Sequence, residues 1–245
     1  MVDPTHFEAL ADIYGEARPP YPPALWNALR GLGVLQPGRR ALDLGAGTGQ
    51  ATGPLLAAGL TVTAVEPGCQ LAACLRSANP EAAVIVERAE DVELPENGFD
   101  VAVAATSIHW MDLDVVLPKV HRALTRRGRF LVWRNVFGVP DVRTPFRERV
   151  ARIVQDRGAP PSPGIDAENV AELSAELTRA ALFSVDVVRT FRWSIELNDR
   201  QVFQLFSTFS DWSVEEAERA AAAVRELGGS VVEHYMTWLI ALTAT

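Results

Sequence analysis

The sequence predicts an α/β fold built on a doubly wound sheet of seven strands. The first observation is a regular alternation of short apolar runs with segments long enough for crossover helices, which is typical of a parallel sheet. The second is a glycine-rich turn at residues 45–49, directly after the first apolar run. The third is a pair of longer stretches rich in β-forming residues late in the chain. We therefore expect five parallel strands followed by a C-terminal antiparallel pair.

Five short apolar runs supply the expected parallel strands. They span residues 41–44, 61–65, 83–86, 99–105 and 130–133. Turn-forming dipeptides precede three of these runs, at Pro37-Gly38, Asn97-Gly98 and Arg127-Gly128. Because glycine and asparagine tolerate the backbone angles of tight turns, these dipeptides mark the entries into the strands.

The pattern changes at Val136, where prolines interrupt the alternation as far as Pro163. We expect an insertion or lid in this part of the chain, with one helix near residues 146–157 and another at 167–180. The stretches 185–197 and 231–243 are rich in alternating β-forming residues and make up the expected antiparallel pair.

Two further helices are expected between these late strands. Val202, Leu205, Phe206 and Phe209 recur at the spacing of one apolar helix face. The segment 213–216 reads Ser-Val-Glu-Glu, which is a capping box that opens a second helix. That helix is expected to end at Gly228-Gly229.

Composition and charge exclude several classes of protein. The chain has 245 residues, of which 48% are apolar and 22% charged, and this suits one large globular domain or a domain with a small annex. The formal net charge is -8, so no overall field favours nonspecific nucleic-acid binding. The most apolar late stretch, 236–244, is too short to span a bilayer, and residues 1–4 do not resemble a secretory signal. We expect a cytoplasmic protein with neither a nucleic-acid nor a membrane partner.

The glycine-rich turn carries the clearest chemical signal. It reads Gly45-Ala46-Gly47-Thr48-Gly49-Gln50, and Asp43 stands two residues before it. Such a strand-to-helix turn lets backbone N–H groups approach a ligand closely, with a helix N-terminus behind them. A dinucleotide-binding fingerprint would place its third glycine at position 50, which is glutamine here. The Gly-x-Gly-x-Gly spacing resembles motif I of class I S-adenosylmethionine-dependent methyltransferases.

The resemblance extends along the next two strands. Glu66 ends the second strand, where it would accept hydrogen bonds from both ribose hydroxyls of the cofactor, followed by Pro67. An NAD enzyme places an acid in nearly the same position, so the distinction rests on the glycine spacing. The resemblance puts Leu71 against the adenine. It also implies that Glu90, which follows Ala89, reads the adenine amino group through its side chain and a ring nitrogen through its backbone N–H.

Two more segments narrow the resemblance. The fourth strand runs into Thr106-Ser107-Ile108-His109-Trp110-Met111-Asp112, and residues 14–22 read Tyr-Gly-Glu-Ala-Arg-Pro-Pro-Tyr-Pro. Both resemble the methyltransferase type 11 group, in the small-molecule branch that includes trans-aconitate methyltransferase-like proteins. The cofactor-binding residues implied are Tyr14, Arg18, Tyr21, Gly45, Ala46, Gly47, Thr48, Gly49, Gln50, Glu66, Pro67, Leu71, Ala89, Glu90, Thr106 and Ser107.

His109 is the candidate general base, because its imidazole titrates near neutral pH at a strand end. The alternative is that the His-Trp pair only shapes the pocket. Candidate residues of the substrate pocket are Trp110, Trp133, Asn135, Phe206, Phe209 and Trp212, although an aromatic stripe on a helix is also typical of ordinary core. Asp112 and Asp114 are interpreted as helix-capping residues rather than metal ligands, and no metal is expected.

The expected function is methyl transfer from S-adenosylmethionine, with S-adenosylhomocysteine as product, to a small organic metabolite. The alternatives are an NAD-dependent oxidoreductase and a non-catalytic S-adenosylmethionine-binding protein. Gln50 argues against the first, as does the lack of a Tyr-x-x-x-Lys pair, since Lys119 is the only lysine and Val115 precedes it by four residues. The ending at 106–109 also departs from the Asn/Asp-Pro-Pro-aromatic pattern of enzymes that methylate base amines.

The predicted organisation is one structural domain with a Rossmann-like core. Residues 1–135 contain an N-terminal lid segment and the cofactor-binding core, and residues 136–182 contain the insertion or lid with its helix. Residues 183–245 complete the sheet and the acceptor pocket. The protein is expected to be a monomer or a homodimer.

Overall fold

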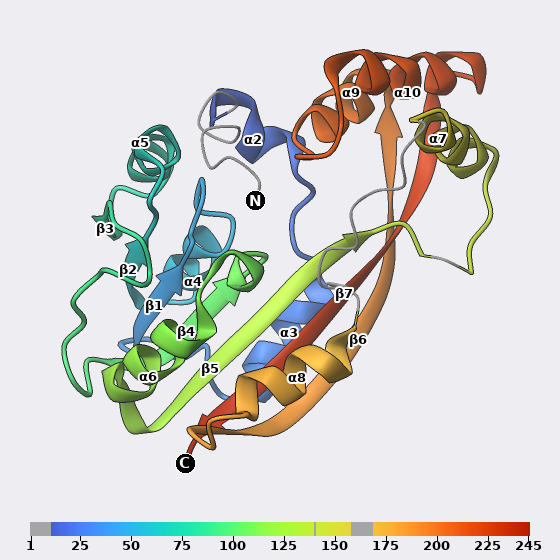
Figure 1. The fold of residues 1–245 in the computed structure, drawn as a ribbon. Helices are drawn as coiled ribbons and strands as arrows, with labels where there is room; N and C mark the ends of the chain where they lie inside the picture. Colours follow the sequence, from blue (N-terminus) through green and yellow to red (C-terminus); the bar gives the residue numbers. More distant parts are fainter. Residues whose placement is uncertain (1–10, 140, 158–168) are drawn as a thin grey trace. The chain divides into compact units, whose positions relative to one another are not determined.

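The computed structural model describes residues 11–139, 141–157 and 169–245, and it contains both helices and strands (Figure 1). In chain order these elements are α2 (Ala11–Ala17), α3 (Pro23–Gly31), β1 (Arg40–Leu44), α4 (Thr52–Ala57), β2 (Thr61–Val65), α5 (Cys69–Ala78), β3 (Ala83–Ile85), β4 (Phe99–Ala105), the 3-10 turn η1 (Ile108–Trp110), α6 (Leu113–Ala123), β5 (Leu124–Phe137), α7 (Pro145–Gln155), α8 (Val170–Thr178), β6 (Phe183–Asn198), α9 (Asp199–Ser207), α10 (Val214–Glu226) and β7 (Ser230–Ala244). None of the helices in the described residues is long and apolar enough to cross a membrane.

The chain divides into two compact units. The sheet unit comprises Pro20–Asn135, Ala167–Phe191 and Thr237–Thr245. The helical unit comprises Met1–Pro19, Val136–Asp166 and Arg192–Met236. Three strands, β5, β6 and β7, have residues in both units.

The seven strands form one sheet in the order β3-β2-β1-β4-β5-β7-β6. The first five in this order pair in parallel, and β7 lies antiparallel between β5 and β6 (Figure 1). This confirms the predicted fold. The chain moves outward from β1 to β3 and then returns to place β4 on the other side of β1. The carboxyl ends of β1 and β4 therefore mark the point at which the strand order reverses, where open α/β sheets bind their ligands.

The fifth strand is longer than the apolar run that predicted it. β5 covers 14 residues, and the dipeptide Arg127-Gly128 lies inside the strand rather than in the turn before it. The pairing of β5 with β4 shifts register between Phe99 and Val101, so the extra residues are taken up in an irregularity. An added Cβ at Gly128 would lie 2.9 Å from the Leu124 Cβ, which explains a glycine at this position.

Alternate strand residues fill the core on one face of the sheet. Ala41 of β1 and Val101 and Val103 of β4 pack with Leu25 and Leu29 from the buried side of α3. In Figure 1, α3 and α4 lie behind this part of the sheet, and α6 and α8 lie in front of it. Helices on both faces explain why these strands read as continuous apolar runs.

The helical unit has a core of its own. Phe146 of α7, together with Val202, Leu205 and Phe206 of α9, belongs to one buried cluster to which α10 contributes a row of alanines. Both α9 and α10 begin with a complete capping box, so the box predicted at residues 213–216 is confirmed.

Candidate functional site

The glycine-rich turn has the backbone conformation that its sequence requires. Gly45, Gly47 and Gly49 have φ angles of +64°, +57° and +95°, in the left-handed region that glycine adopts without a steric penalty. A Cβ on Gly45 would lie 2.5 Å from the Ser107 Cβ, so the turn passes directly over the end of β4. A Cβ on Gly47 would meet no atom of the described residues within 4 Å, so this part of the turn is open on the side of those residues.

The Glu66 carboxylate holds the turn to the end of β2. This side chain is 6% exposed, and its two oxygens accept hydrogen bonds from the backbone N–H groups of Gly47 at 2.8 Å and Gly68 at 2.9 Å. The sequence predicted only its role toward a ribose. Because each carboxylate oxygen has two lone pairs, Glu66 can make both backbone bonds and still accept hydrogen bonds from a diol.

Asp43 lies fully buried beneath the turn. Its Oδ2 accepts a 2.7 Å hydrogen bond from the Thr52 hydroxyl, which links β1 to α4. Burial raises the pKa of Asp43 to about 7, the Thr52 bond opposes that rise, and the nearby charge of Glu66 adds to it. No described residue gives a hydrogen bond to Asp43 Oδ1 or to the buried Thr48 hydroxyl. These two atoms suit a ligand that carries polar groups of its own.

The end of β4 supplies the opposite side of the turn. Ser107 donates a 2.6 Å hydrogen bond to the Leu44 carbonyl, which joins the ends of β4 and β1. Thr106 has a φ of +60°, which is uncommon for a β-branched residue and is typical of strained functional positions. Its hydroxyl lies 3.0 Å from the Tyr21 hydroxyl, and its N–H donates to the Trp133 carbonyl. The structure thus brings together Tyr21, Thr106 and Ser107, three residues that the resemblance assigned to the cofactor site.

The loop around Glu90 is fastened to α6. The Glu90 carboxylate accepts a 2.9 Å hydrogen bond from the Asp112 N–H and lies 3.3 Å from the Arg88 guanidinium. Burial on its own raises the pKa of Glu90, but these hydrogen bonds and the Arg88 charge bring that pKa below its ordinary value. The carboxylate therefore stays ionised at neutral pH.

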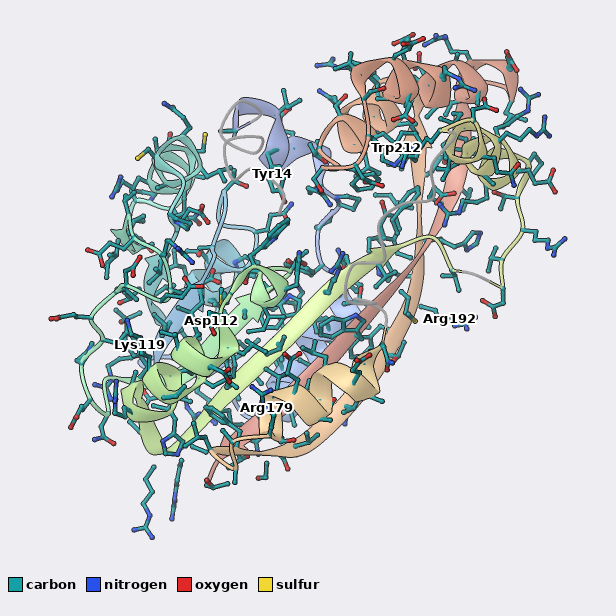
Figure 2. The ribbon with its side chains drawn as sticks, in the orientation of Figure 1. Tyr14, Asp112, Lys119, Arg179, Arg192 and Trp212 are labelled. Carbon is teal, nitrogen blue, oxygen red and sulfur yellow. The ribbon has the colours of Figure 1, made fainter. Side chains whose placement is uncertain are left out.

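Lys119 is a residue that the sequence did not assign to this site. Its ammonium donates to the backbone carbonyls of Glu90 and Val92, the latter at 3.1 Å, and so fixes the loop from the next helix. Figure 2 labels Lys119, which lies in α6, and Asp112, which stands at the start of this helix. Asp112 caps α6, because its side chain accepts a 3.0 Å hydrogen bond from the Asp114 N–H. The capping interpretation of Asp112 is confirmed. The one available signal for Lys119 was its uniqueness among 22 arginines.

His109 and Trp110 lie on η1, directly after the strained residue Thr106 and Ser107. Both side chains are exposed, Trp110 at 48%, and their rings lie 4.8 Å apart. Of the remaining residues predicted in the sheet unit, Ala46, Leu71 and Ala89 are buried, Thr48 and Gln50 are partly buried, and Pro67 is exposed.

Two of the predicted pocket residues belong to cores instead. Trp133 is 0% exposed and packs edge-on against Tyr21 and Trp26 in the sheet unit. Phe206 is fully buried in the cluster of the helical unit. Sequence spacing cannot separate these cases, because an aromatic side chain that fills a core follows the same pattern as one that lines a pocket. Asn135 is partly buried and accepts a 2.6 Å hydrogen bond from Thr237.

Four other predicted residues lie in the helical unit. The Arg18 guanidinium stands over the rings of Tyr14 at 5.2 Å and Phe209 at 4.8 Å, and it donates to the Thr208 carbonyl at 2.6 Å. Phe209 follows the end of α9, and Trp212 packs against Phe206 at 4.3 Å between ring centroids. The cation–π contacts fix Arg18 within this unit.

Comparisons with known proteins agree with this arrangement. Residues 42–132 match the model of a methyltransferase domain. An uncharacterized methyltransferase of Mycobacterium tuberculosis is 37% identical over 130 residues, which are 53% of this chain and 52% of that protein. The match thus spans about half the length of this relative. An uncharacterized methyltransferase of Schizosaccharomyces pombe is 26% identical over 93% of this chain and 88% of its own length.

Solved structures extend the likeness to most of the chain. One assigned as a type II methyltransferase from Anaeromyxobacter dehalogenans has a TM-score of 0.63 at 27% identity, covering 91% of this chain and 97% of that one. A phosphoethanolamine N-methyltransferase of Haemonchus contortus, in complex with phosphomonomethylethanolamine and S-adenosylhomocysteine, has a TM-score of 0.59 at 16% identity. It covers 99% of this chain and 58% of that one, and it shows the fold alone. These matches do not distinguish the trans-aconitate branch, which stays a prediction. The glycine turn, the order of the sheet and the matched domain make residues 42–132 similar to a methyltransferase domain, and the sheet has the Rossmann-like fold of class I S-adenosylmethionine-dependent methyltransferases.

Proposed function

We propose that this protein transfers a methyl group from S-adenosylmethionine to a small organic molecule. The observation that carries the proposal is the pairing of an open glycine turn with the buried Glu66 carboxylate at adjacent strand ends. A turn in which a Cβ on Gly47 would meet no described residue allows close approach of a nucleoside, and the carboxylate beside it is an acceptor for ribose hydroxyls.

The glycine turn and the residues around it would hold different parts of the cofactor. Glu66 would bind the ribose while it keeps the turn in place, and the loop at Glu90, fixed by Lys119, would face the adenine. Asp43 Oδ1 and the Thr48 hydroxyl would satisfy polar groups at the amino-acid end. When bound, S-adenosylmethionine supplies a methyl group on a positively charged sulfur, so the protein's main contribution is to orient the acceptor toward it.

His109 is assigned as the base for acceptors that must lose a proton. Its imidazole is exposed on η1 next to the end of β4, where it is accessible to a small molecule. An acceptor that is already ionised needs no base, and then His109 acts only by shaping the site. Kinetics separate these roles, because a base produces a pH-dependent rate that His109→Ala removes.

Three observations support a small acceptor. The net charge of -8 disfavours nucleic acid. The segment 106–109 lacks the motif of enzymes that methylate base amines. A methyltransferase of the same fold, from Haemonchus contortus, is known in complex with the small molecule phosphomonomethylethanolamine.

The test is transfer of the labelled methyl group from S-adenosylmethionine into fractions of a cell extract. We expect label in the fraction of small molecules, and a loss of that label with Gly47→Leu. Label that appears mainly in protein or nucleic acid would contradict the small-molecule acceptor. Tight binding of S-adenosylmethionine with no label in any fraction would instead support the non-catalytic alternative.

A further inference from the structure

A buried carboxylate lies in the helical unit. Glu233 and Tyr235 lie two residues apart on β7, so their side chains project from the same face of the strand. Glu233 is 0% exposed and Tyr235 is 2% exposed, and Val231 continues the same buried row. A glutamate therefore occupies a position where the strand pattern calls for an apolar residue.

Neither residue has its polar atoms satisfied by the described part of the protein. Both carboxylate oxygens of Glu233 and the hydroxyl of Tyr235 are buried without a hydrogen bond from any described residue. The Arg147 guanidinium approaches Glu233 Oε2 to 3.8 Å, which is too long for a hydrogen bond. Arg147 donates instead to the Phe137 carbonyl at 3.4 Å and lies over the Phe137 ring at 4.5 Å.

Aromatic rings surround this polar group. Tyr235 stacks on Trp193 with ring centroids 4.7 Å apart, and Phe137 meets the Tyr235 ring edge-on at 5.4 Å. Burial raises the pKa of Glu233 to about 7 against the opposing charge of Arg147. Stability does not account for the glutamate, because an apolar residue of similar size in place of a buried charge is often neutral or stabilising.

We propose that Glu233, Tyr235 and Arg147 form a binding site for a small neutral molecule that carries a hydroxyl group on an apolar frame. The hydroxyl would donate to one oxygen of the Glu233 carboxylate and accept from the Tyr235 hydroxyl, which satisfies two of the three buried atoms. The rings of Phe137 and Trp193 would contact the apolar frame. Both aromatic side chains are partly exposed, so the site is bordered by the protein surface.

The charges of the site favour a neutral ligand. Arg147 and Arg18 both place positive charge near Tyr235. An ammonium ligand would be repelled by the two arginines, and an ionised carboxylate ligand has no hydrogen to donate to the buried oxygens of Glu233. The inference rests on the proposed function in one respect only, namely that the bound hydroxyl compound is the methyl acceptor.

The test uses the full chain and four probes of one shape, namely phenethyl alcohol, phenethylamine, phenylacetate and ethylbenzene. Affinities are measured by ligand-observed NMR titration. We expect the alcohol to bind at least tenfold more tightly than the other three probes. Glu233→Met and Tyr235→Phe should each weaken the alcohol about tenfold and leave ethylbenzene unchanged. Glu226→Gln, an exposed carboxylate in the same unit, should change nothing.

Measurements of stability and of cofactor binding distinguish a failure of this site from a failure of the proposed function. Glu233→Met should unfold at the same temperature as the parent or higher, and Tyr235→Phe removes a single oxygen, so the test survives if one variant fails to fold. Equal binding of all four probes to the parent, or full retention of alcohol binding in Tyr235→Phe, would overturn the site. If S-adenosylhomocysteine binds normally in that case, the proposed function still stands. Alcohol binding that needs Tyr235, in a protein that ignores S-adenosylhomocysteine, would support the site and reject the function.

Discussion

The Glu66 carboxylate accepts a 2.8 Å hydrogen bond from the Gly47 amide, and this bond ties the end of β2 to the middle of the glycine turn. The same side chain accepts from the Gly68 amide at the start of the next helix. One buried carboxylate thus joins the middle of the turn to the end of β2 and the start of α5. Under the proposed function, cofactor affinity and local order should therefore depend on the same residue.

Replacing Glu66 by glutamine should weaken binding of S-adenosylhomocysteine about tenfold or more. The glutamine carbonyl oxygen can still accept from one backbone amide, but the NH2 group cannot accept from the other. The turn therefore loses one hydrogen bond to a charged group, which is worth about 1.5–3 kcal/mol, and the remaining bond loses its charge assistance. Calorimetric titration measures the effect, with Glu87→Gln, an exposed glutamate, as the control. Unchanged affinity in Glu66→Gln would mean that the cofactor does not use this carboxylate.

Gly45→Ala should destabilise the protein by about 1–3 kcal/mol, because the residue has a left-handed φ and its new Cβ would collide with Ser107. Denaturant unfolding measures the loss. The double variant Gly45→Ala with Ser107→Gly should recover part of it, since the collision is then removed. Gly31→Ala, in α3 where a Cβ meets nothing within 4 Å, should leave stability equal or slightly higher. A lack of recovery in the double variant would refute the close approach of the turn to β4.

Lys119→Met should lower cofactor affinity several-fold while the protein stays folded. The substitution keeps the apolar stem but removes the donor to the carbonyls of Glu90 and Val92, so the loop loses its fixed position. Arg122→Met, an exposed residue on the same helix, is the matched control. The measurement is a titration of each protein with S-adenosylhomocysteine and with methylthioadenosine. The ratio of the variant's dissociation constant to that of the parent should be the same for both ligands, because both contain the adenine. Equal affinities in parent and Lys119→Met would remove Lys119 from the site.

The buried Asp43 makes stability depend on pH in a defined direction. Burial raises its folded-state pKa to about 7 from 3.8, so the folded protein binds more protons than the unfolded chain between these values. The contribution of Asp43 to the free energy of unfolding is therefore full at acid pH and is lost as the pH rises toward 7. Asp43→Asn removes this loss. Denaturant unfolding at pH 5 and pH 8 measures the difference in the free energy of unfolding between the variant and the parent. This difference should favour the variant more at pH 8 than at pH 5, and an equal difference at the two pH values would contradict the raised pKa.

The parts of the fold that the sequence predicted are those carried by local patterns. The glycine turn, the strand at 99–105 and the capping box at 213–216 each depend on residues that are close together in the chain. The extent of β5 was not predicted, because residues 125–129 of this strand are mostly polar and lie outside the apolar run that marks the strand. Sequence patterns describe periodicity, and long-range pairing is not encoded in them.

The residues of the candidate site also divide into those that local sequence patterns predicted and those that they did not. Gly47 and Glu66 were found because their residue types and spacing are specific for nucleoside binding. Lys119 was missed because its partners are carbonyl groups, which any residue supplies, 27 or more positions away. Trp133 was assigned to a pocket because its pattern is shared by core residues, and only its packing against Tyr21 and Trp26 distinguishes the two.

The most direct test of the central claim is a thermal-shift titration of the full chain with S-adenosylhomocysteine and with NAD. A ligand at 100 times its dissociation constant adds about 2.7 kcal/mol of stability, so binding at the turn is readily detected. Gly47→Leu and Gly38→Leu form a matched pair, because both glycines have a left-handed φ and no atom within 4 Å of an added Cβ. We expect a rise in Tm with S-adenosylhomocysteine in the parent and in Gly38→Leu, none in Gly47→Leu, and none with NAD. A rise with NAD alone, or an undiminished response in Gly47→Leu, would contradict the account.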